Sequence, residues 1–210
     1  MDLWDDLADE RRALADLLEG LSPEQWRVQT LCEAWDVHGM AAHLTVPCTF
    51  SRIEMVTTMV RAGGNPDRLS VLMARRRATM SSSELVAVLR DRAGARLAPP
   101  VVGVMGPYTD ALVHGQDIMV PLGLADERPA VRWLPALEFL VSRRARVGFV
   151  SGALPQVTME ATDMGWAHGR VGPQVRGSAS ALALALLRRT ARLDELTGDG
   201  APVLREWATG

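Results

Sequence analysis

A polar stripe on one otherwise apolar segment, Asp110-Ala-Leu-Val-His114-Gly-Gln-Asp117, constrains the fold of this chain more than any other feature. Its three ionisable residues stand at positions i, i+4 and i+7, so a helix places them on one face, each about one turn from the next. Leu112 and Ile118 supply apolar neighbours. The segment is therefore predicted to be a helix that packs against others, with its polar stripe satisfied by partners or by an ion.

A carboxylate and an imidazole one helical turn apart can share a metal ion, as paired histidines do in helical zinc motifs. Asp110 and His114 have this spacing, but two side chains cannot close a site. His43, on a separate amphipathic segment, is the candidate for the third ligand. Three roles are open for Asp117. It is a further metal ligand, a partner that fixes the tautomer of a histidine, or a hydrogen-bond partner of a neighbouring helix, and we favour the last two roles.

The composition is that of a globular, soluble protein, with 210 residues, 48% apolar and 23% charged. A net charge of −2 predicts neither a nucleic-acid partner nor a polybasic membrane contact. The chain has no apolar run long enough to span a bilayer and no signal-peptide pattern, so we expect a cytoplasmic protein. All 23 basic residues are Arg, which excludes a Schiff-base lysine and a phosphate-loop lysine. A serine nucleophile elbow is also absent.

Periodic apolar residues and helix-capping residues predict that the first part of the chain is helical. Asp36 is expected to cap one long helix. Because proline lacks the backbone N–H, either this helix bends at Pro47 or the carbonyl of His43 finds another partner. A short helical turn is expected near Trp26. The main predicted helices are 2–20, 37–61, 82–96, 107–120 and 131–150. Residues 67–79 form either a short helix or a mobile loop.

The pattern changes near Gly152. Residues 156–162 alternate between apolar and polar, which predicts a strand, and 166–170 and 171–176 are expected to be two further strands. Helices are predicted at 178–187 and 201–208. The sequence thus predicts a mainly α protein, with a helical bundle in residues 1–151 and a small α/β domain in residues 152–210.

Three motifs in order resemble the mycothiol-dependent maleylpyruvate isomerase family. The first is Leu31-Cys32-x-x-Trp35-x-Val37-x-x-Met40-Ala41-Ala42-His43-Leu44. The second is Asp110-x-x-x-His114-x-x-Asp117, in which the family usually has Glu at the position of Asp110. The third is the tail from Val157 to Trp207, which is similar to the small C-terminal domain of the family. Together they cover nearly the whole chain.

This resemblance implies a DinB-like four-helix bundle that binds a divalent metal, with zinc the usual ion and nickel or iron as alternatives. It implies His43 and His114 as ligands, with Asp110 in place of the family's Glu, one methylene shorter. It also implies mycothiol, the thiol of actinobacteria, as cofactor. The implied activity is that of an isomerase or S-transferase in which a metal-bound thiolate attacks a small electrophilic substrate. We expect the protein to be a monomer or a homodimer.

Several other polar residues receive structural interpretations. Cys32 and Cys48 are expected to be packed thiols, His38 to lie at the surface, and His168 to have a structural role in the C-terminal part. Three arginines are weaker candidates for binding a carboxylate substrate: Arg176, Arg188 and Arg189.

Two other classes of function remain open. Two histidines and one carboxylate also suit non-haem iron that reacts with oxygen. The non-enzymatic alternative is a helical binding protein whose metal site has degenerated. Metal analysis and an iron-dependent oxygen-uptake assay would separate the two metalloenzyme classes.

Overall fold

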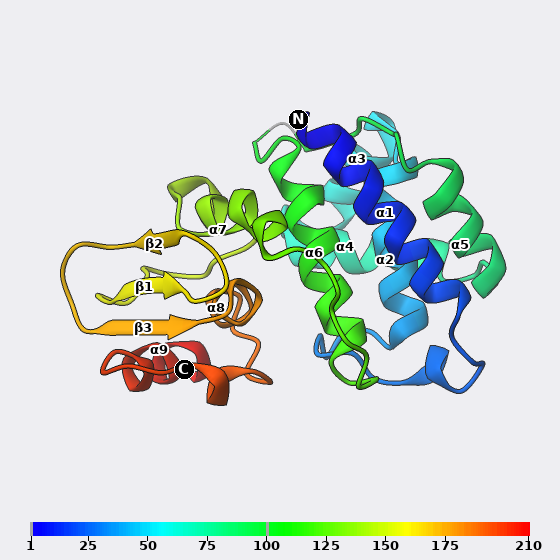
Figure 1. The fold of residues 1–210 in the computed structure, drawn as a ribbon. Coiled ribbons are helices and arrows are strands. Elements are labelled where there is room, and N and C mark those ends of the chain that lie inside the picture. The colour runs from blue at the N-terminus through cyan, green and yellow to red at the C-terminus, as the bar shows by residue number, and fades with distance from the viewer. Residues whose placement is uncertain (1, 100) are drawn as a thin grey trace. The chain divides into compact units, whose positions relative to one another are not determined.

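The computed structural model describes residues 2–99 and 101–210 (Figure 1). The chain divides into two compact units, Met1–Ala125 and Asp126–Gly210. The first is helical, and the second combines helices with a three-stranded sheet. The predicted fold class, a helical bundle followed by a small α/β part, is confirmed. In the described residues, no helix has both the length and the apolar character required to cross a membrane.

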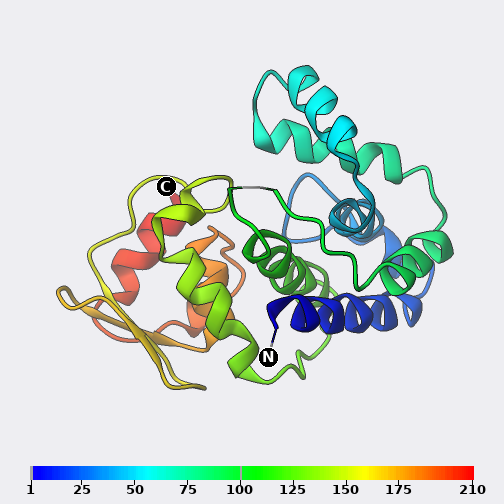
Figure 2. The ribbon, with the colours of Figure 1, turned by 90° about the horizontal axis from the view of Figure 1, so that it is seen from above.

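Four helices form the bundle of the first unit: α1 (Leu3–Glu19), α2 (Val37–Thr49), α5 (Ser82–Asp91) and α6 (Met105–Met119). Both α1 and α2 pack against α5 and α6, so the four helices close a ring around one core (Figure 2). Leucines three to four positions apart on α1 face this core, as amphipathic periodicity requires. They are Leu7, Leu14 and Leu18.

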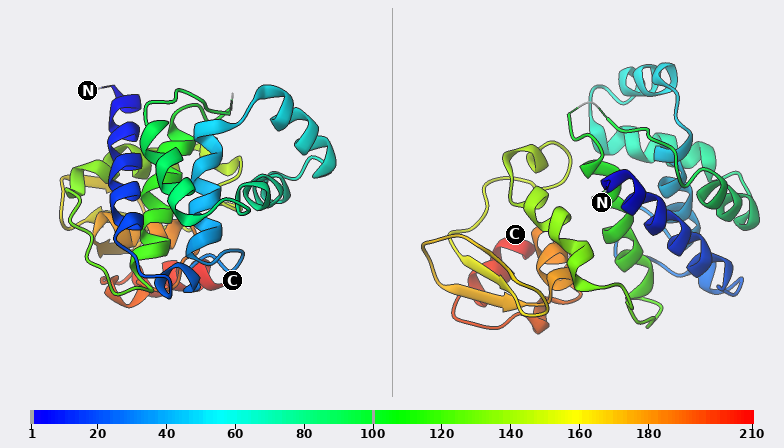
Figure 3. Two further views of the ribbon diagram at one scale, coloured as in Figure 1. Left: turned by 90° about the vertical axis from the view of Figure 1, so that its right-hand side faces the viewer. Right: turned by 45° about the horizontal axis from the view of Figure 1, so that its top comes forward.

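A helical hairpin, α3 (Arg52–Arg61) and α4 (Pro66–Arg77), is inserted between α2 and α5. It extends away from the bundle, as the left view of Figure 3 shows, while α4 packs against both α2 and α3. Its apolar base is formed by Val46, Phe50 and Met73 with partly buried neighbours that include Leu69. Of the two alternatives for residues 67–79, the helix is confirmed.

The prediction of a single helix for residues 37–61 is wrong. Phe50 and Ser51 are extended, with ψ angles of 145° and 156°, and the Ser51 side chain accepts a hydrogen bond from the backbone N–H of Glu54 at 3.0 Å. Pro47 lies in the last turn of α2, where its missing N–H weakens the helix end. Because Ser51 then offers a cap, a second helix begins in place of a continued first one.

A buried arginine ties α1 to residues near the ends of two other helices. Arg11 is 3% exposed and donates to the carbonyl oxygens of Ala93 and Ala95, both at 2.8 Å. It also donates to the Pro47 carbonyl at 3.4 Å. Burial lowers the pKa of Arg11, which nonetheless stays charged because its ordinary value is so high. The guanidinium satisfies backbone carbonyls that the ends of α2 and α5 leave unpaired.

Helix α8 (Ala179–Leu186) forms the centre of the second unit, and all of its residues are buried. It packs against α7 (Leu134–Leu140), α9 (Ala201–Thr209) and strands β1 (Thr158–Ala161) and β3 (Gln174–Gly177). The sheet has the order β2-β1-β3, with β2 (Trp166–His168) antiparallel and β3 parallel to β1. Short 3₁₀ helices join these elements: η1 (Gln25–Arg27) in the first unit, and η2 (Ala130–Trp133), η3 (Arg143–Arg146) and η4 (Leu193–Glu195) in the second.

The long helix predicted for residues 131–150 is also wrong, because only α7 is α-helical there. Pro135 in the first turn favours a helix start at this point. Ser142 ends the segment with a ψ of 160°. Since α7 packs against α8, it is grouped with the second compact unit, which begins at Asp126. The assignment of residues 1–151 and 152–210 to two domains stays a prediction.

Candidate metal centre

Three side chains of the first unit meet at one place: His43 of α2, and Asp110 and His114 of α6. Their candidate ligand atoms lie within 4.8 Å of one another. The Asp110 carboxylate oxygens are 4.0 Å from His43 Nε2 and 3.8 Å from His114 Nε2. The centroids of the two imidazole rings are 4.9 Å apart. The three residues selected from the sequence are thus brought together, and metal binding by them stays a prediction.

Each histidine is oriented through its other ring nitrogen. His114 Nδ1 lies 2.8 Å from the carboxylate of Asp117, which is fully buried, and His43 Nδ1 lies 3.0 Å from the hydroxyl of Ser70 on α4. An ionised carboxylate only accepts hydrogen bonds, so Asp117 holds the His114 proton on Nδ1. The lone pair of His114 Nε2 then faces Asp110, as a metal ligand requires.

Trp35 covers one side of this group. Its indole ring stacks on the His43 imidazole with centroids 4.5 Å apart and planes inclined by 18°. It meets the His114 ring edge-on at 6.0 Å. The stacking restricts rotation of the His43 ring and keeps water from one of its faces.

The loop that carries Trp35 is held at several points. The Thr30 hydroxyl and the Gln29 side-chain amide both donate to the Trp35 carbonyl at 2.7 Å. The backbone N–H of Leu31 donates to the carbonyl of Asp117 on α6 at 3.1 Å. The first sequence motif therefore builds a wall of the site in addition to supplying His43.

Burial favours the neutral form of His43, the form that binds metals. Both histidines are 8% exposed. Desolvation lowers the pKa of His43 well below its ordinary value, and the nearby His114 lowers it further. The Asp110 side chain is 26% exposed, which makes it the most accessible of the three candidate ligands.

This donor set fits a zinc-type ion. Two imidazoles and one carboxylate are a known catalytic set that leaves a coordination position open. With metal–ligand bonds of about 2.0 to 2.2 Å, the ligand atoms of a tetrahedral ion lie roughly 3.3 Å apart. The oxygen–nitrogen separations of 3.8 and 4.0 Å therefore need to shorten by only about half an ångström. The Asp110 carboxylate thus lies close to both histidines despite its short side chain.

The other histidines and the cysteines have structural surroundings. His38 is half-buried and its Nε2 lies 3.1 Å from the Ala78 carbonyl oxygen, so it links α2 to the residue after α4 and does not have the expected surface role. His168 stacks on Trp166 in β2. Cys48 is buried, and its desolvation raises the pKa of the thiol. Cys32 is partly buried.

The three candidate arginines lie in the second unit. Arg176 on β3 forms an ion pair with Glu160 at 3.3 Å. The Arg188 guanidinium lies 4.6 Å from the centroid of the Trp207 ring. Arg189 follows directly and donates to the Leu187 carbonyl. Substrate binding by these arginines stays a prediction.

Sequence reasoning missed Ser70. It lies between Leu69 and Met73, which belong to the apolar base of the hairpin, so helical periodicity could have placed it near the inward face of α4. Its contact with His43 depends on the packing of α4 against α2, which no local pattern reveals.

Residues 7–98 match the family model of the mycothiol maleylpyruvate isomerase N-terminal domain, a stretch that contains His43 and Ser70 and ends before α6. Two crystal structures have a similar fold, that of the mycothiol-dependent maleylpyruvate isomerase and that of a mutant of it with one histidine replaced by alanine. Each is 15% identical, with a TM-score of 0.54 over 96% of this chain and 97% of that chain. Among curated proteins, none matches this chain.

Proposed function

Since the chain belongs, through residues 7–98, to the mycothiol maleylpyruvate isomerase N-terminal domain family, we propose that it is a metal-dependent enzyme that uses a low-molecular-weight thiol on a small electrophilic substrate. Mycothiol is the proposed thiol, and isomerisation of an activated double bond is the proposed reaction. The convergence of His43, Asp110 and His114 is the observation that carries this proposal.

The proposed roles of the residues follow from their contacts. His114 is held by Asp117 in the tautomer that presents Nε2, and burial keeps His43 neutral, so both offer a lone pair. Asp110 adds one negative charge that offsets part of the charge of a divalent ion. When bound, such an ion supplies an open position at which a thiol loses its proton easily.

The reacting thiol is proposed to come from outside the protein. Cys48 is unsuited to be a nucleophile, because it is 0% exposed and its pKa is raised. The absence of lysine removes an amine nucleophile on a side chain. Trp35 shields His43 from water, so the accessible side of the proposed site is that of Asp110.

The test is elemental analysis of the purified protein together with a thiol-dependent assay on maleylpyruvate. We expect close to one equivalent of metal and turnover only when mycothiol is present. An isomerase returns the thiol unchanged, whereas an S-transferase consumes one thiol for each product formed, so thiol titration at the end of the reaction separates the two activities. Full turnover without any added or co-purified thiol would contradict the proposal.

The same donor set supports a second candidate, an iron enzyme that reacts with oxygen. Iron as the bound metal, with oxygen uptake that needs iron but no thiol, would favour it. Zinc as the bound metal, with no oxygen uptake, would favour the thiol-dependent enzyme.

A further inference from the structure

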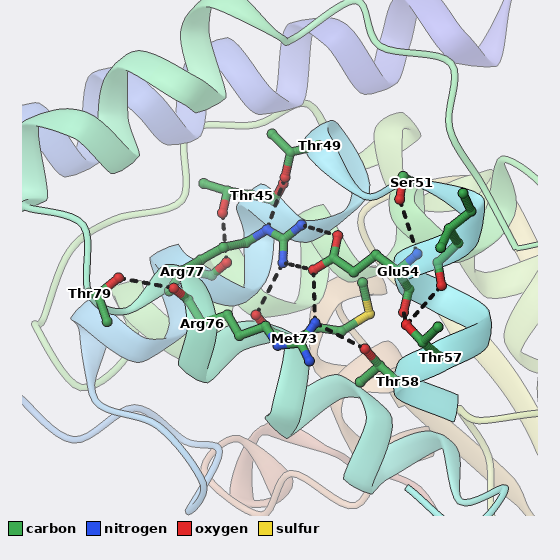
Figure 4. Close-up of polar contacts among 12 residues, drawn as sticks. Thr45, Thr49, Ser51, Glu54, Thr57, Thr58, Met73, Arg76, Arg77 and Thr79 are labelled. Carbon is green, nitrogen blue, oxygen red and sulfur yellow. Dashed lines mark hydrogen bonds and ion pairs between the residues drawn. The ribbon is translucent and has the colours of Figure 1, made fainter. Parts of the chain in front are cut away.

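Two arginines of α4, Arg76 and Arg77, join this helix to α3, and Arg77 makes the closer contact with Glu54 (Figure 4). The Arg77 guanidinium on α4 donates through both terminal nitrogens to the two carboxylate oxygens of Glu54 on α3, each at 3.0 Å. This two-pronged geometry is the strongest form of an arginine–carboxylate pair. The side chains are 11% and 22% exposed, so solvent screens the pair less than it would at the open surface.

Arg77 also connects the hairpin to the bundle. Its Nε donates to the Thr49 hydroxyl at the end of α2 at 2.9 Å. Beside it, Arg76 donates to the buried hydroxyl of Thr58 on α3 at 3.2 Å. These contacts join α2, α3 and α4, and we call Thr49, Glu54 and Arg77 the Arg77 cluster.

Ser70 lies seven residues before Arg77 on α4. Seven residues are almost two turns of a helix, so both side chains project from nearly the same face, about 10 Å apart along the axis. Both reach α2, Ser70 at His43 and Arg77 at Thr49. Two attachment points fix both the rotation of α4 and its position along α2.

We propose that Ser70 is a positioning residue for His43 and that the Arg77 cluster holds it in place. The proposal rests on the proposed role of His43 as a metal ligand. The Ser70 hydroxyl accepts the proton of His43 Nδ1, which leaves Nε2 free for the metal. Unlike the carboxylate of Asp117, a hydroxyl can donate a hydrogen bond as well as accept one. Ser70 alone therefore holds the imidazole less firmly, and its effect on His43 depends on how rigidly α4 fixes its position.

The first test measures zinc affinity by competition with a chelator in the full-length protein. Loss of such an outer partner typically weakens metal binding about 10- to 100-fold, and we expect this for both Ser70→Ala and Arg77→Gln. Ser70→Thr keeps the hydroxyl and should remain close to the wild type. Arg75→Gln is the matched control, since Arg75 is exposed on the same helix and the substitution removes the same charge.

The second test needs no metal. Nitrogen–proton NMR of the imidazoles reports the tautomer and hydrogen bonding of each ring. In metal-free Ser70→Ala and Arg77→Gln, the His43 signals should shift while those of His114 stay in place. Arg75→Gln should move neither. Thermal unfolding checks each fold, and Ser70→Ala keeps the test valid if Arg77→Gln unfolds the hairpin, because it removes a single oxygen atom.

The outcomes separate this inference from the proposed function. If the wild type binds zinc, and Ser70→Ala and Arg77→Gln bind it equally tightly with unshifted His43 signals, the positioning role is overturned and the metal site stands. If the wild type binds no metal, the proposed function fails, and the role of Ser70 toward a metal fails with it.

Discussion

Asp110 lies between the two imidazoles, 3.8 Å from His114 Nε2 and 4.0 Å from His43 Nε2. Asp110→Ala removes the charged member of the donor set, so we expect the purified protein to lose most of its metal. The helix should remain intact, because alanine is the better helix former. Elemental analysis measures the loss of metal. The control is Asp91→Ala, which makes the same substitution at an exposed residue of α5. Stoichiometric metal in Asp110→Ala would remove Asp110 from the site.

The spacing at Asp110 also predicts the effect of a longer side chain. Its carboxylate stands slightly farther from both nitrogens than a tetrahedral zinc requires, a gap that a longer side chain can close. Asp110→Glu is therefore expected to keep stoichiometric metal, with an affinity within about tenfold of the wild type. A loss as large as that of Asp110→Ala would show that the helices are spaced for aspartate.

Asp117 gives a test of tautomer control. Its buried carboxylate accepts the Nδ1 proton of His114 at 2.8 Å. In Asp117→Asn the amide can donate to Nδ1, which moves the proton to Nε2 and blocks the ligand atom. We expect a weakening of zinc binding of about 10- to 100-fold, measured by chelator competition. Unchanged affinity would assign Asp117 a structural role alone.

Local patterns revealed the residues of this site that lie close in sequence. Helical spacing paired Asp110 with His114, and the motif around Trp35 added His43. Ser70 and Arg11 stayed hidden for a physical reason. Their contacts cross 27 residues to His43 and 82 residues to Ala93, and only tertiary packing brings those partners near.

At the scale of elements, the α3–α4 hairpin should depend on pH through Glu54. Its hydrogen bond with Arg77 is the main cause of a pKa below the ordinary 4.5. A carboxyl group whose pKa is lower in the folded state than in the unfolded state stabilises the fold at pH values above the unfolded-state pKa. This contribution is lost as the pH falls through the folded-state pKa. The wild type should thus exceed Glu54→Gln in free energy of unfolding by a constant amount well above pH 4.5, and by less below it. Denaturant titrations at several pH values measure this, and a difference independent of pH would contradict it.

Helix starts were easier to predict than helix ends. Asp36 caps α2 as predicted, and the helix predicted to begin at residue 82 does so because Ser81 caps α5 through side-chain hydrogen bonds. The predicted helix ends were wrong where the apolar periodicity of the sequence continued across a break in the helix. Ser51 and Ser142 interrupt two such runs with extended backbone, and in the first run the competing cap decides the outcome.

At the scale of the whole molecule, metal binding should raise the resistance to heat. A ligand at about 100 times its dissociation constant adds roughly 2.7 kcal/mol to the free energy of unfolding. For a chain of this size, that amounts to a rise in Tm of about 5 to 11 °C. Calorimetry with and without zinc should show the rise in the wild type and none in Asp110→Ala. Equal shifts in both proteins would point to zinc bound elsewhere.

The fold class followed from composition and periodicity, because amphipathic helices must bury their apolar stripes against one another. The grouping of residues 131–150 with one of the two compact units did not follow from either. Residues 131–150 carry a helical pattern that suits either unit, and the contact of α7 with α8 assigns them to the second. No property of that segment alone specifies its partner.

The position of α6 in the ring has a consequence for synthesis on the ribosome. The chain adds about 5 to 20 residues per second, and α6 ends 70 residues after α2, so roughly 4 to 14 s separate the completion of the two helices. During that interval α1 and α2 lack the neighbour that closes their ring, and His43 lacks both partners from α6. The nascent chain must therefore avoid aggregation through an open apolar groove until its last bundle helix has been synthesised.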